Sequence, residues 1–98
     1  MFDFEKLEVY QKAKLFHSGV YNFILANKAL DPSTKNQLRR ASLSIMLNIA
    51  EGSSRFGKAD RRNFFVISRG SVFECVAIFD FLKEEELVSK ELHTDFYL

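Results

Sequence analysis

Cysteine, proline, glycine and tryptophan are all scarce in this 98-residue chain, which has one Cys, one Pro, four Gly and no Trp. A single cysteine, Cys75, excludes an internal disulfide framework and is typical of a reducing cytoplasm. No apolar run approaches the roughly 20 residues of a membrane span. The N-terminus carries Asp3 and Glu5 where a signal peptide has a basic region. We therefore expect a cytoplasmic protein that has no membrane partner.

Phenylalanine, by contrast, is abundant, with 11 residues in a chain that is 47% hydrophobic. A chain of this length is expected to form one domain, residues 1–98. Such a small domain hides only about two-thirds of its surface when it folds. The surplus of aromatic surface therefore predicts a subunit interface, and hence a homo-oligomer. A Phe-rich monomer core is the alternative.

Apolar residues recur at three- and four-residue spacing along most of the chain, which predicts helices. No stretch alternates as a strand would. Short connections favour antiparallel neighbours. The expected fold is all-α, an up-and-down antiparallel four-helix bundle whose fourth helix is short or truncated. The expected helices span about 4–26, 32–52, 58–86 and 90–98.

Helix boundaries are indicated by a few local signals. Asp31 is a good N-cap, and Pro32 fits the first helical position, where its missing N–H is not needed. Gly52 and Gly57 are expected to end the second helix through left-handed and turn conformations. Gly70, between two serines, is expected to let the third helix approach the second closely.

Charge is distributed unevenly along the chain, although its net value is only +1. Residues 35–69 hold eight basic and two acidic residues, a net charge of +6, whereas residues 70–98 hold two basic and seven acidic residues, a net charge of −5. Phosphate contacts require cations placed with moderate precision. The basic segment is therefore a candidate surface for RNA or DNA. Its candidate binding residues are Arg39, Arg40, Arg55, Lys58, Arg61 and Arg62.

A second constellation combines carboxylates with amide, hydroxyl and guanidinium groups. Paired carboxylates can serve acid–base chemistry or a metal, but a di-metal bundle requires Glu-x-x-His motifs, and neither His17 nor His93 stands in one. We interpret the set as a structural network of Arg–Glu pairs and helix-end hydrogen bonds. Its members are Asn48, Glu51, Arg69, Ser71 and Glu74, with Arg40 as a further partner.

Catalytic chemistry has no other recognisable basis in the sequence. Cys75 lies on an apolar helix face, where it is expected to be a core residue. The glycines around Gly52 lack the lysine and the preceding strand of a phosphate-binding loop. We therefore expect no catalytic residues, no metal, no cofactor and no enzymatic activity.

A family resemblance is carried by the run QLRRASLSIMLNIAEGSSR, residues 37–55, and by Phe64, Arg69, Gly70, Ser71 and Glu74 further on. These residues resemble the bacterial four helix bundle protein family, which includes proteins encoded in intervening sequences of large-subunit ribosomal RNA genes. The run LEVYQKAKLF, residues 7–16, is similar to its first-helix signature. The resemblance implies a small helical bundle that associates into a ring, usually a pentamer. Related accessory proteins of diversity-generating retroelements bind nucleic acid and a reverse transcriptase.

Two functions remain open at this point. The first is a non-enzymatic bundle oligomer, a pentamer by resemblance, that binds RNA or DNA backbones or assists a nucleic-acid-processing protein. The alternative is a structural or adaptor oligomer that binds a protein partner without contacting nucleic acid. In that case the basic residues would form a solvated face or pair with the acidic run 84–86 of a neighbouring subunit.

Overall fold

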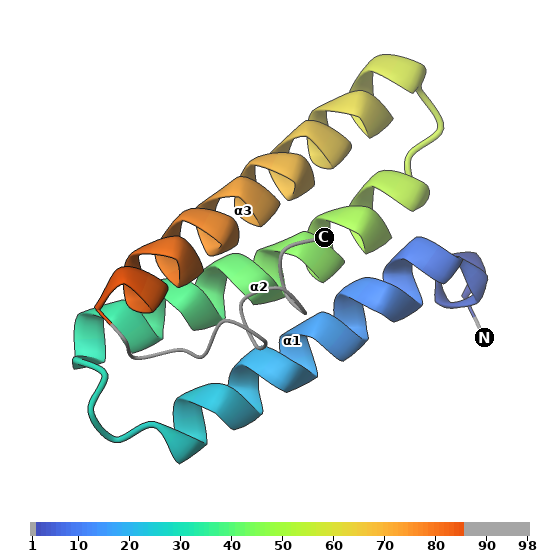
Figure 1. Cartoon of the computed structure of the whole chain (residues 1–98). Helices are drawn as coiled ribbons and strands as arrows, with labels where there is room; N and C mark the ends of the chain where they lie inside the picture. The colour runs from blue at the N-terminus through green and yellow to red at the C-terminus, as the bar shows by residue number, and fades with distance from the viewer. Residues whose placement is uncertain (1, 86–98) are drawn as a thin grey trace.

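Three α-helices account for most of residues 2–85, which is the part of the chain that the computed structural model describes (Figure 1). One turn of 3₁₀-helix precedes them, and the described residues form no strand. α2 lies between α1 and α3, packs against both, and runs antiparallel to each. The elements are η1 Asp3–Lys6, α1 Glu8–Ala26, α2 Pro32–Ser53 and α3 Lys58–Glu84. The all-α prediction is confirmed, while the expected fourth helix at 90–98 lies outside the described residues.

The start of α2 follows the predicted capping chemistry. Asp31 accepts a hydrogen bond from the backbone N–H of Thr34 at 2.8 Å and another from the Thr34 hydroxyl at 2.9 Å. Pro32 occupies the first turn, where no backbone donor is needed. The Thr34 hydrogen bonds also lower the pKa of Asp31, because they favour the ionised carboxylate.

The end of α2 differs from the prediction, because glycine does not close the helix. Ser54 has right-handed backbone angles, φ −85° and ψ −9°, and its hydroxyl donates to the Glu51 carbonyl at 2.7 Å. Gly57 is extended, with φ −81° and ψ 139°. Gly52 is needed for packing instead, since a Cβ there would lie only 2.8 Å from the ring of Phe65.

The N-terminal prediction of one continuous helix from residue 4 was also wrong. The backbone is extended at Leu7, with φ −72° and ψ 129°, and this residue separates η1 from α1. The Gln11 side chain donates to the Glu5 carbonyl at 2.7 Å. The Phe4 ring meets Tyr10 edge-on, with centroids 4.9 Å apart. These contacts fasten η1 to the first turns of α1.

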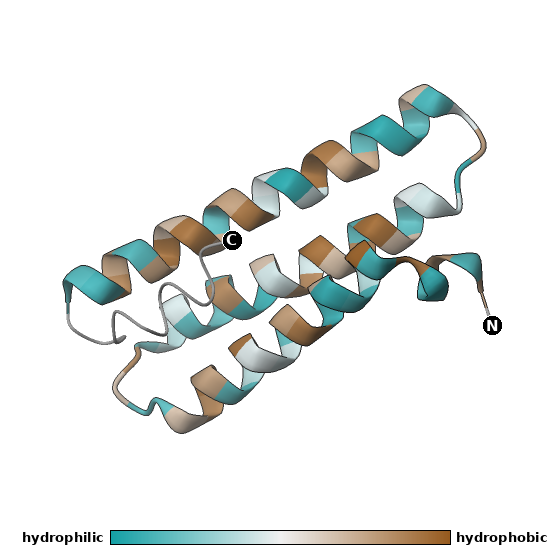
Figure 2. Cartoon of the chain, turned by 45° about the vertical axis from the view of Figure 1, so that its right-hand side comes forward, coloured by the Kyte–Doolittle hydropathy of each residue, from teal (hydrophilic) through white to brown (hydrophobic). Residues whose placement is uncertain are grey.

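All three helices contribute to the core. Figure 2 shows hydrophobic segments along each of them. Phe23 of α1 meets Phe79 of α3, with ring centroids 5.5 Å apart. Val20, Leu38 and Leu82 are almost completely buried. Among the helices of residues 2–85, none combines the length and the apolar character that crossing a membrane requires.

Serine hydroxyls join the helices where they approach each other. Ser68 of α3 donates to the Ile45 carbonyl of α2 at 2.9 Å, in a buried position. Ser71 donates to the Ser44 hydroxyl at 2.9 Å. Gly70 has no atom within 4 Å of the place where a Cβ would stand. The prediction that Gly70 permits the close approach was therefore wrong, because the small residues at the interface are the serines on either side of it.

Candidate nucleic-acid interface

Four of the predicted basic residues gather where α2 passes into α3. We call Arg55, Lys58, Arg61 and Arg62 the basic turn; all four are exposed. Arg61 fixes its shape, because its Nε donates to the Arg55 carbonyl at 2.7 Å and its backbone N–H donates to the Gly57 carbonyl at 3.0 Å. The chain path is thus set by one of the cations themselves.

Arg55 has partners from both helices. Its guanidinium lies 3.1 Å from a carboxylate oxygen of Glu51, one turn earlier in α2. It also lies 4.8 Å from the centroid of the Phe64 ring of α3, a cation–π distance. The Glu51 pair is half-exposed, and such pairs contribute at most about 1 kcal/mol. Arg55 is therefore held in place, but its charge is partly neutralised by Glu51.

Lys58 and Arg62 differ from Arg55 in their electrostatic surroundings. Within residues 2–85, neither forms an ion pair with a carboxylate. They line a shallow depression of about 440 Å³ on the surface of α3. Its full lining is Lys58, Arg61, Arg62, Phe65, Val66 and Arg69. The spacing of these residues places them along one side of α3. Cations and apolar surface are thus side by side.

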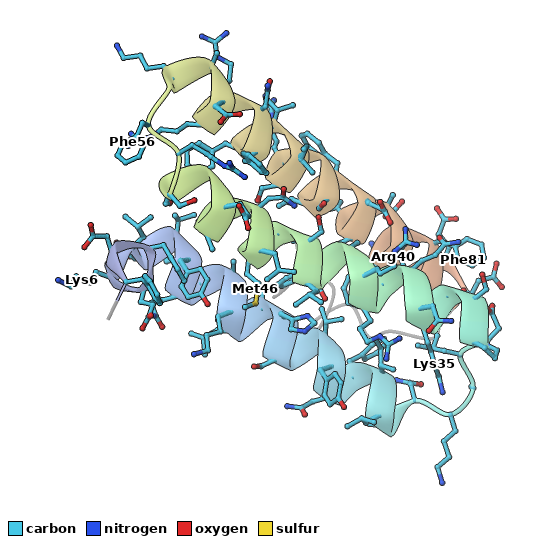
Figure 3. All side chains as sticks on the ribbon, turned by 180° about the vertical axis from the view of Figure 1, so that it is seen from behind. Lys6, Lys35, Arg40, Met46, Phe56 and Phe81 are labelled. Carbon is cyan, nitrogen blue, oxygen red and sulfur yellow. The ribbon has the colours of Figure 1, made fainter. Side chains whose placement is uncertain are left out.

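Arg39 and Arg40 lie apart from the basic turn. Both belong to the first half of α2, and a rise of about 1.5 Å per residue puts Arg40 roughly 20 Å along the helix axis from Ser53, the last residue of α2. Figure 3 shows Arg40 and Lys35 toward one end of the molecule and Phe56, in the turn, at the other. The structure therefore divides the six predicted residues into a group of four and a separate pair.

The predicted polar network is only partly brought together. Asn48 donates to the carbonyl and to the hydroxyl of Ser44, at 2.8 and 2.9 Å, and Ser71 reaches the same hydroxyl from α3. Ser44 is thus the central residue, and its place one turn before Asn48 was the signal that sequence reasoning missed. Glu51 pairs with Arg55, four residues further along the chain, and not with the expected partner on another helix.

Arg69 and Glu74 do not join that network. The Arg69 guanidinium lies 5.5 Å from the centroid of the Phe73 ring, one turn further along α3. Glu74 is exposed on the same helix. The Arg–Glu pairs expected between helices are not among the ion pairs of residues 2–85, both of which join residues four apart in sequence.

Two titratable groups lie at or inside the helix interfaces. His17 Nδ1 is hydrogen-bonded to the Ser42 hydroxyl at 2.7 Å, and the same hydroxyl lies 3.1 Å from the Arg39 carbonyl. Burial, and then the charge of Arg39, lower the pKa of His17. Burial, and then the charge of Glu74, raise the pKa of Cys75 to about 12. Cys75 is 1% exposed, which confirms it as a core residue.

Metal binding has no evident place in the part of the chain that is described. No group of three or more His, Cys, Asp or Glu side chains there is arranged to hold a metal ion. Sequence reasoning did not single out the exposed apolar residues near the basic turn, which are Phe65 and Val66 on α3 and Phe56 at the tip of the turn. Phe56 could have been singled out from the sequence, because it is an aromatic residue within a basic turn.

Fold and surface together define a small helical protein whose most distinctive feature is a basic turn between two long helices. A family model described as "23S rRNA-intervening sequence protein" matches residues 5–98. The chain belongs to this family, as the resemblance predicted. Searches of curated proteins and of solved structures found no match.

Proposed function

We propose that this protein is a non-enzymatic, cytoplasmic helical-bundle oligomer whose basic turn binds the phosphate backbone of RNA or DNA. The observation that carries the proposal is the pair of exposed cations, Lys58 and Arg62, which have no carboxylate partner in residues 2–85. Arg55 and Arg61 add charge and hold the turn. Contacts of this kind bind phosphates without reading the sequence. A family name that refers to ribosomal RNA intervening sequences supports a nucleic-acid setting.

Self-association is the second part of the proposal. α3 exposes large apolar side chains away from α2, among them Val66 at 58%, Phe73 at 59% and Phe81 at 56%. Exposed apolar surface of this extent marks an interaction site. In a homo-oligomer, a pentamer by family resemblance, each subunit would add one basic turn, and a modest affinity per turn would be multiplied. We further propose that residues 90–98 supply the fourth helix of the bundle.

Charge reversal at two sites tests the role of the basic turn. The double variant Lys58→Glu/Arg62→Glu should weaken binding to generic RNA and to duplex DNA alike. It should also flatten the dependence of affinity on salt, by about one unit of the log–log slope for each cation removed. Arg61 is unsuitable for this test, because its side chain holds the Arg55 carbonyl.

The matched control is Arg39→Glu/Arg40→Glu, which changes the net charge equally but lies in the first half of α2. We expect this control to retain most of the affinity and the salt slope. Unchanged binding by the Lys58/Arg62 variant would contradict the assignment of the basic turn. Equal losses of affinity in both double variants would mean that binding depends only on the net charge of the protein.

An adaptor oligomer that binds only a protein partner is the second candidate. The exposed apolar surface of α3 favours it, because this surface suits a protein at least as well as a nucleic acid. Light scattering at micromolar protein, combined with RNA binding at low salt, separates the two functions. An oligomer that binds no RNA or DNA would support the adaptor, and a monomer would contradict self-association in both.

A further inference from the structure

Phe56 is the most exposed large hydrophobic residue of the described chain. Its relative exposure is 101%, and it stands at the tip of the connection between α2 and α3 (Figure 3). Covering a phenylalanine ring on folding is worth about 1.5–3 kcal/mol, and this ring contributes nothing of that kind to the fold. In the sequence it directly follows Arg55 and precedes Lys58 by two residues, so it belongs to the same connection as the basic turn.

We propose that Phe56 stacks on an unpaired base, so that the basic turn prefers single-stranded nucleic acid to a duplex. This inference rests on the proposed function, because the cations of the turn must first hold the backbone. Surfaces that bind single strands combine a basic track with exposed aromatic rings, on which bases stack regardless of their identity. In a duplex the faces of the bases are already covered by their neighbours, so the ring gains no such contact.

The depression on α3, which includes three of the four cations of the basic turn, also combines cations with an aromatic ring. Phe65 is 42% exposed and lies in the depression of α3 together with Val66, between Lys58, Arg62 and Arg69. An apolar floor bordered by cations fits nucleotides, since the phosphates can lie on the cations while a base covers the floor. Phe56 and Phe65 therefore offer two apolar surfaces at one basic site.

Loss of the ring is the first arm of the experiment. Phe56→Ala should weaken binding to oligouridylate by roughly 5- to 150-fold, the range that stacking on one base gives, and should leave the affinity for duplex DNA unchanged. Because Phe56 is fully exposed, the substitution removes no packing. The matched control is Tyr21→Ala, an aromatic residue of α1 that is 47% exposed and belongs neither to the basic turn nor to the apolar surface of α3, and it should change neither affinity.

Fluorescence provides the second arm. The chain has no tryptophan, so Phe56→Trp introduces a single reporter at the tip of the turn. Its emission should be quenched when oligouridylate binds and should change little when duplex DNA binds. Tyr21→Trp is the matched control and should respond to neither ligand. A Phe56→Trp signal that shifts with protein concentration alone would mean that a second copy covers the ring, and this would overturn the proposal.

Failure of the stacking proposal can be told from failure of the proposed function. If Phe56→Ala binds single strands as tightly as the natural chain, while Lys58→Glu/Arg62→Glu binds them less well, stacking is wrong and phosphate binding stands. Equal losses on single strands and duplex would also overturn the preference for unpaired bases. If the natural chain binds neither ligand at low salt, both proposals fail.

Discussion

Both faces of α3 carry large apolar side chains, but these side chains have very different surroundings. On the face toward α2, Cys75, Phe79 and Leu82 are buried, and the hydroxyls of Ser68 and Ser71 are hydrogen-bonded across the interface. On the other side, Val66, Phe73 and the cations of the basic turn are exposed. A helix that is apolar around most of its circumference needs more than one neighbour. The inner face therefore stabilises the chain, and the outer face is exposed within residues 2–85, as the proposed self-association requires.

The largest contrast should come from two phenylalanines of α3. Phe79→Ala should lower the free energy of unfolding by about 3–5 kcal/mol, because the ring is 2% exposed and packs on Phe23. Phe73→Ala should change it by less than about 0.5 kcal/mol in the monomer. Urea denaturation over a range of protein concentrations measures both, because only self-association depends on concentration.

Similar losses of unfolding free energy in Phe79→Ala and Phe73→Ala at the lowest protein concentration would contradict the contrast between the two faces. Phe73 would then contribute to the fold itself. An effect of Phe73→Ala that grows with protein concentration would instead support this contrast, because it would place Phe73 in the contact between subunits.

Alanine substitutions at two glycines should change the free energy of unfolding in opposite directions. Gly52→Ala should destabilise the protein by about 1–3 kcal/mol, because the new Cβ would lie 2.8 Å from the Phe65 ring and 3.1 Å from Phe64 Cβ. Gly70→Ala should stabilise it by about 0.5–1 kcal/mol, since no atom lies within 4 Å and alanine is the better helix former. Thermal or urea unfolding of the two variants checks this, and stabilisation by both would contradict the close packing at Gly52.

Cys75 tests whether the inner face is closed to solvent. Its pKa is raised to about 12, so almost none of the thiol is ionised at pH 8. We expect alkylation by iodoacetamide to be at least about 100-fold slower in the native protein than in urea. Native labelling that is as fast as labelling in urea would mean that α3 separates readily from α2.

The smallest expected effect concerns pH and the contact between α1 and α2. Because the folded chain lowers the pKa of His17, the unfolded chain takes up a proton there first as the pH falls. The free energy of unfolding should therefore decline below about pH 6.5. His17→Gln should remove this part of the pH dependence, and Arg39→Gln should raise the pKa of His17 in an NMR titration. A pKa at or above 6.5 in the natural chain would contradict the burial of the ring.

Local signals explain how much of the fold was predictable. Asp31, Pro32 and the apolar periodicity give helix positions within a few residues, because capping and amphipathic packing depend on near neighbours. The break at Leu7 could not be predicted, since the apolar pattern continues through it. Gly52 and Gly70 could not be told apart either, because the role of each depends on what the neighbouring helix places opposite.

The candidate site was predictable only in part, for reasons of geometry. In the sequence the basic segment is one continuous charged region, but in the fold it extends along α2 and into α3. Arg39 and Arg40 therefore lie in the first half of α2, far from the turn that holds Arg62. Glu51 was expected to pair between helices, yet Arg55 stands four residues away on the same surface, and the local pair forms.

Salt-dependent binding of the natural chain tests the central claim most directly. Affinity for generic RNA should be measured between about 50 and about 200 mM salt, on protein whose mass in solution is known. We expect the logarithm of affinity to fall with the logarithm of salt concentration, with a slope of about −2 or steeper, because Lys58 and Arg62 each displace counterions from phosphates. Absence of binding at the lowest salt, or binding that salt does not weaken, would contradict the role of the basic turn.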